Sequence, residues 1–172
     1  CLRVRIWVGD SGPSRLPYAM NLAERAFEAG LKIQPTIFLS DRWADLYKQP
    51  EPESWASLNF KDKLKLIESY VSKVVERLTS IKVRCSYYQI GNEIDYGICG
   101  IFARDKKKRK NREWLKNRIW SYEAIVLREA IRAVRTYEDE KPIALHLGKW
   151  WDPVLAESFL CALDEFKVEY EI

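Results

Sequence analysis

The sequence predicts an α/β fold built on a parallel sheet. Segments of strand length, rich in β-branched and aromatic residues, alternate with amphipathic helical segments along the 172 residues. The strand–helix unit repeats every 30 to 55 residues, roughly the length of a unit that joins parallel strands by helical crossovers. The segments after the strands are long, aromatic and charged.

Two strand–helix units occupy the first half of the chain. Residues 2–10, LRVRIWVGD, have the composition of a strand and end in a Gly-Asp stop. Residues 16–29 carry apolar side chains on one helical face. Residues 31–41 form a second strand, in which Pro35 is an unusual member. After a loop rich in Pro, Trp and charge, residues 61–79 form the clearest helix.

The second half of the chain continues the alternation. A third strand at 83–93 leads through a basic loop to a helix near 118–137. The remaining elements are a strand at 142–150, a helix at 153–165 and a strand that opens at 167–172.

Both doubly wound sheets and (β/α)₈ barrels are built from such units. A Gly-rich phosphate loop after a strand would favour the first, and the sequence contains none. Long loops after the strands are typical of barrels, whose active sites lie at the carboxyl ends of the strands. Because a complete barrel takes about 250 residues, we expect a partial TIM barrel, about strands 2 to 6 with outer helices.

Composition narrows the classes of function. The net charge of +4 does not by itself imply nucleic acid, and no stretch reaches the length of a membrane span. Seven Trp and nine Tyr exceed what a core needs, and flat aromatic faces are suited to sugar rings. Four cysteines without C-x-x-C spacing and a single His argue against zinc, so we predict no metal and no cofactor. Cys85 and Cys161 have apolar neighbours and are predicted to be buried thiols, while a disulfide is left open.

Four ordered motifs resemble the endo-β-1,4-galactanases, family 53 of the glycoside hydrolases. The motifs are VRIWV on strand two, LSDRWADLYKQPEPESW after strand three, IGNEIDYGI on strand four and IALHLGKWW on strand five. The resemblance implies a retaining (β/α)₈ glycosidase. Residues 1–172 would then form an incomplete catalytic domain that lacks strand 1 and strands 7–8.

The resemblance also implies roles for residues near the strand ends. Glu93 matches the general acid/base, and Asn92 matches the residue that binds the sugar 2-OH. Arg5 matches the strand-two arginine near the nucleophile. Arg3 lies on the same strand face, and the motif rather than the alternation selects Arg5.

Further substrate-binding candidates lie in the loops. Trp43 and Asp45 match the loop after strand three, as a stacking platform and a polar sugar contact, with loop scaffolding as the alternative. His146 matches the strand-five histidine. Trp150 or Trp151 would stack on sugar while the other packs against the protein.

The sequence departs from the family pattern at several places. The nucleophile is expected from the seventh strand and is missing from this chain, so we expect the chain alone to be inactive. Thr36 and Phe38 replace the usual Asp and His, and Gly148-Lys149 replaces acidic residues. The run RDKKKRKNR at 104–112 is not a family feature and is interpreted as a solvated charged surface.

We therefore predict endo-hydrolysis of β-1,4-galactosidic linkages in arabinogalactan by a retaining double displacement. The alternatives are another retaining β-glycosidase with altered sugar specificity, or a non-catalytic carbohydrate-binding half-barrel. The predicted partner is β-galactan or a related polysaccharide, with self-association through open strand edges. Nucleic-acid binding through the basic run ranks last, and the family implies an extracellular protein.

Overall fold

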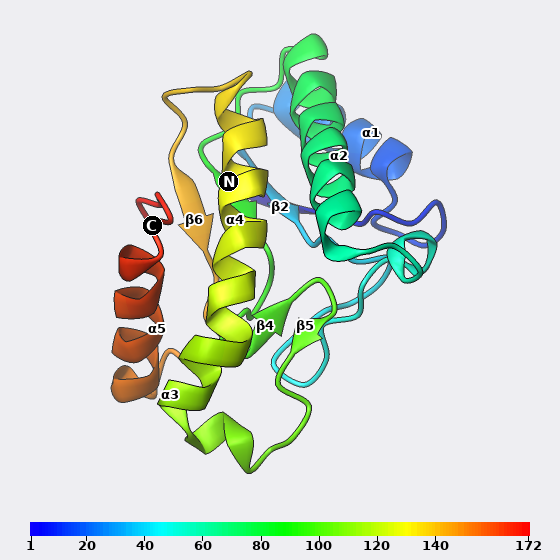
Figure 1. The fold of residues 1–172 in the computed structure, drawn as a ribbon. Helices are drawn as coiled ribbons and strands as arrows, with labels where there is room; N and C mark the ends of the chain where they lie inside the picture. Colours follow the sequence, from blue (N-terminus) through cyan, green and yellow to red (C-terminus); the bar gives the residue numbers. More distant parts are fainter.

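The computed structural model describes all residues, 1–172. Figure 1 shows strands and helices alternating along the chain. The main elements are β1 (Leu2–Ile6), α1 (Leu16–Glu28), β2 (Ile33–Ile37), α2 (Phe60–Ser80), β3 (Tyr88–Ile90), α4 (Ser121–Arg135), β6 (Ile143–Leu145) and α5 (Pro153–Glu165). Shorter elements are β4 (Gly97–Ile98), β5 (Ile101–Phe102), α3 (Arg112–Leu115), a π-helical turn (Lys116–Trp120) and 3₁₀ turns at Glu53–Trp55 and Lys108–Lys110.

Four strands form one parallel sheet in the order β1-β2-β3-β6. Strand order follows chain order because each pair of neighbours is joined by a helical crossover. α2 packs against α4, and α4 also contacts α5 and β3. In Figure 1, α2 and α4 lie side by side in front of the sheet. The predicted parallel sheet with outer helices is confirmed.

The strand face that meets the helices is aliphatic. Its side chains are at most 1% exposed and include Val4, Ile6, Ile33, Ile37, Ile90 and Ile143. They join the apolar stripes of the helices in one core. Because side chains alternate along a strand, the intervening residues point to the opposite face, where Arg3, Thr36 and Gln89 lie.

Two strands are shorter than predicted. The strand expected at 83–93 is regular only over Tyr88–Ile90, and the strand expected at 142–150 only over Ile143–Leu145. Ile33 bridges Cys85 while Thr36 pairs with Gln89, so β2 advances three residues against four on its neighbour. Pro35 lies in this irregular stretch, where its missing N–H breaks no regular ladder.

Residues 167–172 do not form an assigned strand, contrary to the prediction. The last residue nevertheless binds β6: Leu145 N–H donates to the Ile172 carbonyl at 2.8 Å, and Ile172 N–H donates to the Ile143 carbonyl at 3.1 Å. These are the bonds of a parallel neighbour. The end of the chain therefore covers the outer edge of β6.

All four cysteines are free thiols. Burial raises the pKa of Cys85 to about 11 and that of Cys99 to about 12, so both are unreactive near neutral pH. Cys161 is exposed, and the prediction that it is buried was wrong. The buried stripe of α5 is formed instead by Leu155, Phe159, Ala162 and Leu163.

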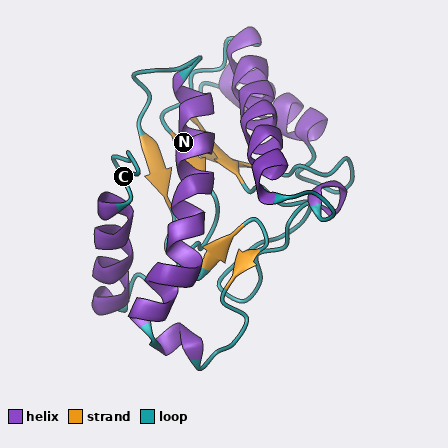
Figure 2. Ribbon diagram, in the orientation of Figure 1, coloured by secondary structure: helices purple, strands orange, loops and turns teal.

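The longest loops follow β2 and β3 and gather at one end of the sheet, as Figure 2 shows. That end is the carboxyl end of the parallel strands, where loops from different units meet. No helix combines the length and apolar character needed to cross a membrane.

Candidate active site

Glu93 lies just after β3, where the chain turns sharply at the strand's carboxyl end. Gly91 has φ +75°, and a side chain there would come within 2.5 Å of Ile94. Glu93 itself has φ +51°, a left-handed conformation that costs a non-glycine residue on the order of 1 kcal/mol. The structure thus holds a half-exposed carboxylate in a strained backbone position.

The loop after β2 fixes Glu93 at two places. Leu46 N–H donates to Glu93 Oε2 at 3.1 Å. The buried Gln49 side chain donates to the carbonyls of Asn92, at 2.8 Å, and Glu93, at 3.1 Å. Glu93 Oε1 makes no hydrogen bond within the chain, so one carboxyl oxygen is free.

Asn92 is buried and nearly saturated with hydrogen bonds. Its Oδ1 accepts from Arg3 Nη2 at 2.7 Å and lies 2.9 Å from His146 Nδ1. Its Nδ2 donates to the Ala44 carbonyl at 2.8 Å. Because arginine is only a donor, these contacts fix the amide orientation and leave one amide hydrogen for a further partner.

Charges meet beside this amide. Partial burial and the neighbouring Arg5 lower the pKa of Arg3, whose guanidinium still stays protonated at neutral pH. Burial and then the charge of Arg3 lower the pKa of His146, although Glu93 opposes this shift. His146 is therefore neutral near pH 7. It donates from Nδ1 to Asn92 and keeps Nε2 as an acceptor.

The two arginines of β1 have different partners. Arg3 Nε also donates to Thr36 Oγ1 at 3.1 Å and to Gln89 Oε1 at 3.3 Å. The Arg5 guanidinium lies 5.4 Å from the centre of the Trp43 ring. The structure thus brings Arg3 to Asn92, while the predicted role of Arg5 beside a nucleophile stays a prediction.

Asp45 is occupied within its own loop. Its Oδ2 accepts from Trp43 Nε1 at 2.9 Å, and its Oδ1 accepts from the N–H groups of Tyr47, at 2.8 Å, and Lys48, at 3.1 Å. This geometry supports the scaffolding alternative for Asp45 and fixes the Trp43 ring. A direct sugar contact by either residue stays a prediction.

Trp150 and Trp151 are both exposed, at 77% and 58% of their surface. Their rings meet edge to face at 5.9 Å. The expectation that one of them packs against the protein is therefore wrong. Both offer aromatic surface in the loop that follows β6.

Gly148 and Leu46 share the space next to Glu93. A side chain at Gly148 would begin 2.6 Å from Leu46 Cγ and 3.0 Å from Glu93 Cβ. An acidic residue at 148 does not fit while Leu46 occupies this position. Two departures from the family motifs, Leu46 in place of proline and Gly148 in place of an acid, are therefore in contact.

Sequence reasoning missed the positioning roles of Arg3, Gln49 and Asp95. The buried Asp95 carboxylate accepts from the N–H groups of Gly148, at 2.7 Å, and Lys149, at 2.9 Å, and so fixes the loop after β6 to the turn that carries Glu93. Strand alternation already placed Arg3 toward the inner face. The contacts of Gln49 and Asp95 come from loop geometry, which has no periodic signal.

Comparison with known proteins gives the same assignment along the whole chain. The glycosyl hydrolase family 53 model matches residues 1–172. An endo-beta-1,4-galactanase of Bacillus subtilis is 28% identical over 183 aligned positions, covering 99% of this chain and 38% of that protein. Arabinogalactan endo-beta-1,4-galactanase A of Emericella nidulans is 33% identical over 98 positions, covering 56% of this chain and 28% of that protein.

Two solved structures share the fold. The Ignisphaera aggregans GH53 catalytic domain superposes with a TM-score of 0.82 at 22% identity, over 98% of this chain and 46% of that one. A structure from work on two fungal beta-1,4-galactanases gives 0.80 at 23% identity, over 96% and 47%. This chain thus spans less than half the length of these relatives, and its sheet and helices are part of a TIM barrel. The chain belongs to glycosyl hydrolase family 53.

Proposed function

We propose that residues 1–172 supply the acid/base half of a retaining endo-β-1,4-galactanase. The observation that carries the proposal is the Glu93 carboxylate, held by Leu46 N–H at the carboxyl end of β3 and adjacent in sequence to the amide that Arg3 and His146 contact. Family membership supports glycoside hydrolysis, and relatives named as galactanases support β-1,4-galactan as the substrate.

In the first step, the protonated Glu93 gives its proton to the departing glycosidic oxygen. A carboxylate nucleophile attacks the anomeric carbon and forms a glycosyl–enzyme bond. In the second step, the Glu93 carboxylate takes a proton from the water that breaks this bond. The unbonded Oε1 is the oxygen that we assign to both proton transfers, since Oε2 already accepts from Leu46.

The nucleophile has to lie about 5–5.5 Å from Glu93 in a retaining enzyme. By resemblance it comes from the seventh strand. We therefore propose that residues 1–172 are a catalytic domain lacking strand 1 and strands 7–8, and that catalysis requires the remaining part of the barrel.

The surrounding residues would bind the sugar. The remaining amide hydrogen of Asn92 is available to the 2-OH, an interaction that strengthens in the transition state. Neutral His146 offers Nε2 as an acceptor, and the rings of Trp43 and Trp150 offer flat surfaces to pyranose rings. The crowding between Leu46 and Gly148 shapes the wall next to Glu93.

The test uses Glu93→Gln in the polypeptide that contains residues 1–172, assayed on β-1,4-galactan. Loss of general acid–base catalysis is expected to lower kcat by about 10²–10⁴-fold, with little change in the Kd of galacto-oligosaccharides. An aryl galactoside with a good leaving group needs no protonation in the first step. Its glycosylation rate is expected to fall far less.

Glu53→Gln is the matched control, because Glu53 is an exposed acid on the loop after β2. It should leave kcat unchanged. Equal losses for galactan and the activated galactoside, or undiminished activity in Glu93→Gln, would refute the assignment.

The second candidate is a non-catalytic carbohydrate-binding protein. Phe38, at a position where the family usually carries a polar residue, is fully buried and packs between Trp7 and Trp43. This candidate predicts galacto-oligosaccharide binding in the wild type without hydrolysis. The same pair of assays distinguishes the two.

A further inference from the structure

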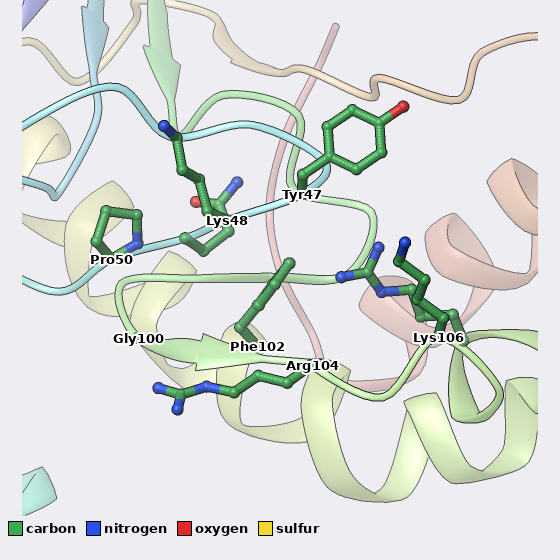
Figure 3. A pocket seen from close by; sticks show the side chains of 9 residues that line it. Tyr47, Lys48, Pro50, Gly100, Phe102, Arg104 and Lys106 are labelled. Carbon is green, nitrogen blue, oxygen red and sulfur yellow. The ribbon is translucent and has the colours of Figure 1, made fainter.

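A basic pocket of about 450 Å³ opens between the loop after β2 and the segment that follows β5. Four of its nine lining residues are cationic, and none is acidic: the cations are Lys48, Arg104, Lys106 and Arg109. Figure 3 shows Phe102 in the middle of the pocket, with Tyr47 and Lys48 on one side and Arg104 and Lys106 on the other.

The four cations have no carboxylate partner in the chain. None takes part in a salt bridge, whereas Lys63 pairs with Glu51 and Lys149 pairs with Asp152. The nearby Asp105 accepts a backbone N–H from residue 107 and does not line the pocket. Like charges gathered without a counter-charge repel each other, and an anion in the pocket would relieve that repulsion.

Arg109 is held in place before any ligand binds. Its guanidinium lies 4.8 Å from the ring centres of both Tyr96 and Phe102. Nε donates to the Ala103 carbonyl at 2.7 Å, and Nη1 donates to the Leu46 carbonyl at 3.2 Å. Three of the five guanidinium N–H groups remain, and a rigid planar fork of this kind matches a carboxylate.

The pocket is connected directly to the acid/base site. Leu46 donates its N–H to the Glu93 carboxylate and accepts from Arg109 through its carbonyl. Gln49 lines the pocket and also donates to the Glu93 carbonyl. Tyr47, at the rim, is 75% exposed and offers its ring to a sugar. A polysaccharide bound at Glu93 would therefore have its next residues within reach of the cations.

We propose that this pocket is a subsite for a carboxylate-bearing sugar, a uronic acid residue within or beside the galactan chain. The proposal rests on the proposed galactanase function, which it extends from a neutral to an acidic polysaccharide. A nucleic acid fits the observations less well. The cations surround one compact pocket with a single strongly exposed aromatic ring at its rim, rather than forming a track for successive phosphates and bases.

The test measures equilibrium binding in the Glu93→Gln polypeptide, so that no probe is hydrolysed. The probes are a neutral β-1,4-galactotetraose, the same chain carrying one galacturonate residue, and a single-stranded oligothymidylate. We expect the acidic oligosaccharide to bind about tenfold more tightly than the neutral one at low salt. The difference should shrink as salt is added.

Arg104→Gln/Lys106→Gln is expected to remove this tenfold preference and leave binding of the neutral probe unchanged. Both side chains are exposed and make no hydrogen bonds, so folding should be unaffected. Lys107→Gln/Lys110→Gln is the matched control, with the same loss of charge on exposed residues of the same segment outside the pocket. Arg109→Lys keeps the charge but loses the fork, and should remove part of the preference.

Equal binding of acidic and neutral probes would overturn the proposal. Equal losses in the pocket and control variants would also overturn it, because they would indicate diffuse attraction. Tighter binding of the oligothymidylate, lost in the pocket variant, would assign the pocket to nucleic acid. If wild-type polypeptide neither binds nor hydrolyses neutral galactan while the pocket preference persists, the galactanase proposal fails and the acidic subsite stands.

Discussion

The two faces of the four-stranded sheet differ in how their side chains are held. The helix-facing side chains, such as Ile33, are aliphatic and buried. On the opposite face Arg3, Thr36 and Gln89 bond to one another, and Arg3 continues the network to Asn92. One face is stabilised by removing apolar surface from water, and the other by specific donors and acceptors.

The difference explains why the faces contribute differently to the protein. Burying an aliphatic side chain contributes roughly 1.5–3 kcal/mol with little demand on direction. A polar pair contributes a net 0.5–1.5 kcal/mol, roughly, but it specifies distances and angles. The aliphatic face therefore holds the barrel segment together, and the polar face positions the Asn92–Glu93 turn.

The largest expected effect compares two residues of β2. Ile33→Ala removes a fully buried side chain from the aliphatic face and should lower the free energy of unfolding by about 2–5 kcal/mol. Thr36→Val, on the polar face, keeps the volume and removes one acceptor of Arg3, so about 1 kcal/mol is expected. Urea unfolding followed by the fluorescence of the seven tryptophans measures both. A Thr36→Val loss as large as that of Ile33→Ala would show that the polar face also determines stability.

The second prediction concerns the two arginines of β1. Arg3→Met leaves the Asn92 oxygen without its cation and should lower kcat/KM on galactan about 100-fold, with little change in the unfolding midpoint. Arg5→Met is the matched control on the same strand face and should cost less, because Arg5 stacks on Trp43 rather than on Asn92.

Steady-state kinetics of the two variants in the polypeptide that contains residues 1–172 decide between them. A larger loss for Arg5→Met would favour the assignment made from the sequence motif, in which Arg5 supports the nucleophile. Rescue of Arg3→Met by Arg3→Lys would indicate that charge alone suffices. We expect poor rescue, since one guanidinium serves three acceptors.

How much the sequence predicts follows the same division between the faces. Aliphatic residues recur with the period of a strand or helix, so the order and type of β1, α1, β2, α2 and α4 were predicted. The ends of β3 and β6 were not, because the backbone leaves the regular ladder while its side chains stay apolar. The position of Glu93 at a strand end followed from its motif, and its contact with Leu46 did not.

The site partners lie far apart in sequence and share no period. Arg3, Thr36 and Asn92 meet only because three parallel strands place them on one face at one level. Alternation indicates the face but not which polar atoms pair across it. For this reason the strand pattern could not choose between Arg3 and Arg5, and the coordinates were needed to show which one reaches Asn92.

The third prediction concerns an exception within the apolar core. Glu123 of α4 is completely buried, and neither carboxyl oxygen has a hydrogen-bond partner. Burial, and then the charge of Asp95, raise the pKa of Glu123 well above 4.5, so the folded protein keeps this carboxyl protonated. The unfolded chain loses the proton as pH rises above about 4.5. The free energy of unfolding should therefore fall by about 1.4 kcal/mol per pH unit until the folded-state pKa is passed.

Glu123→Gln removes the titration and nearly preserves the shape. Its stability should match that of the wild type near pH 4.5 and exceed it increasingly toward pH 7.5, as measured by urea unfolding across this range. Glu129→Gln, on the same helix, is the control: Glu129 pairs with Arg132 at the surface, and its loss should cost under about 1 kcal/mol at every pH in this range. Parallel stability curves for Glu123→Gln and the wild type would mean that the buried carboxyl ionises without cost, which requires a partner that this core does not provide.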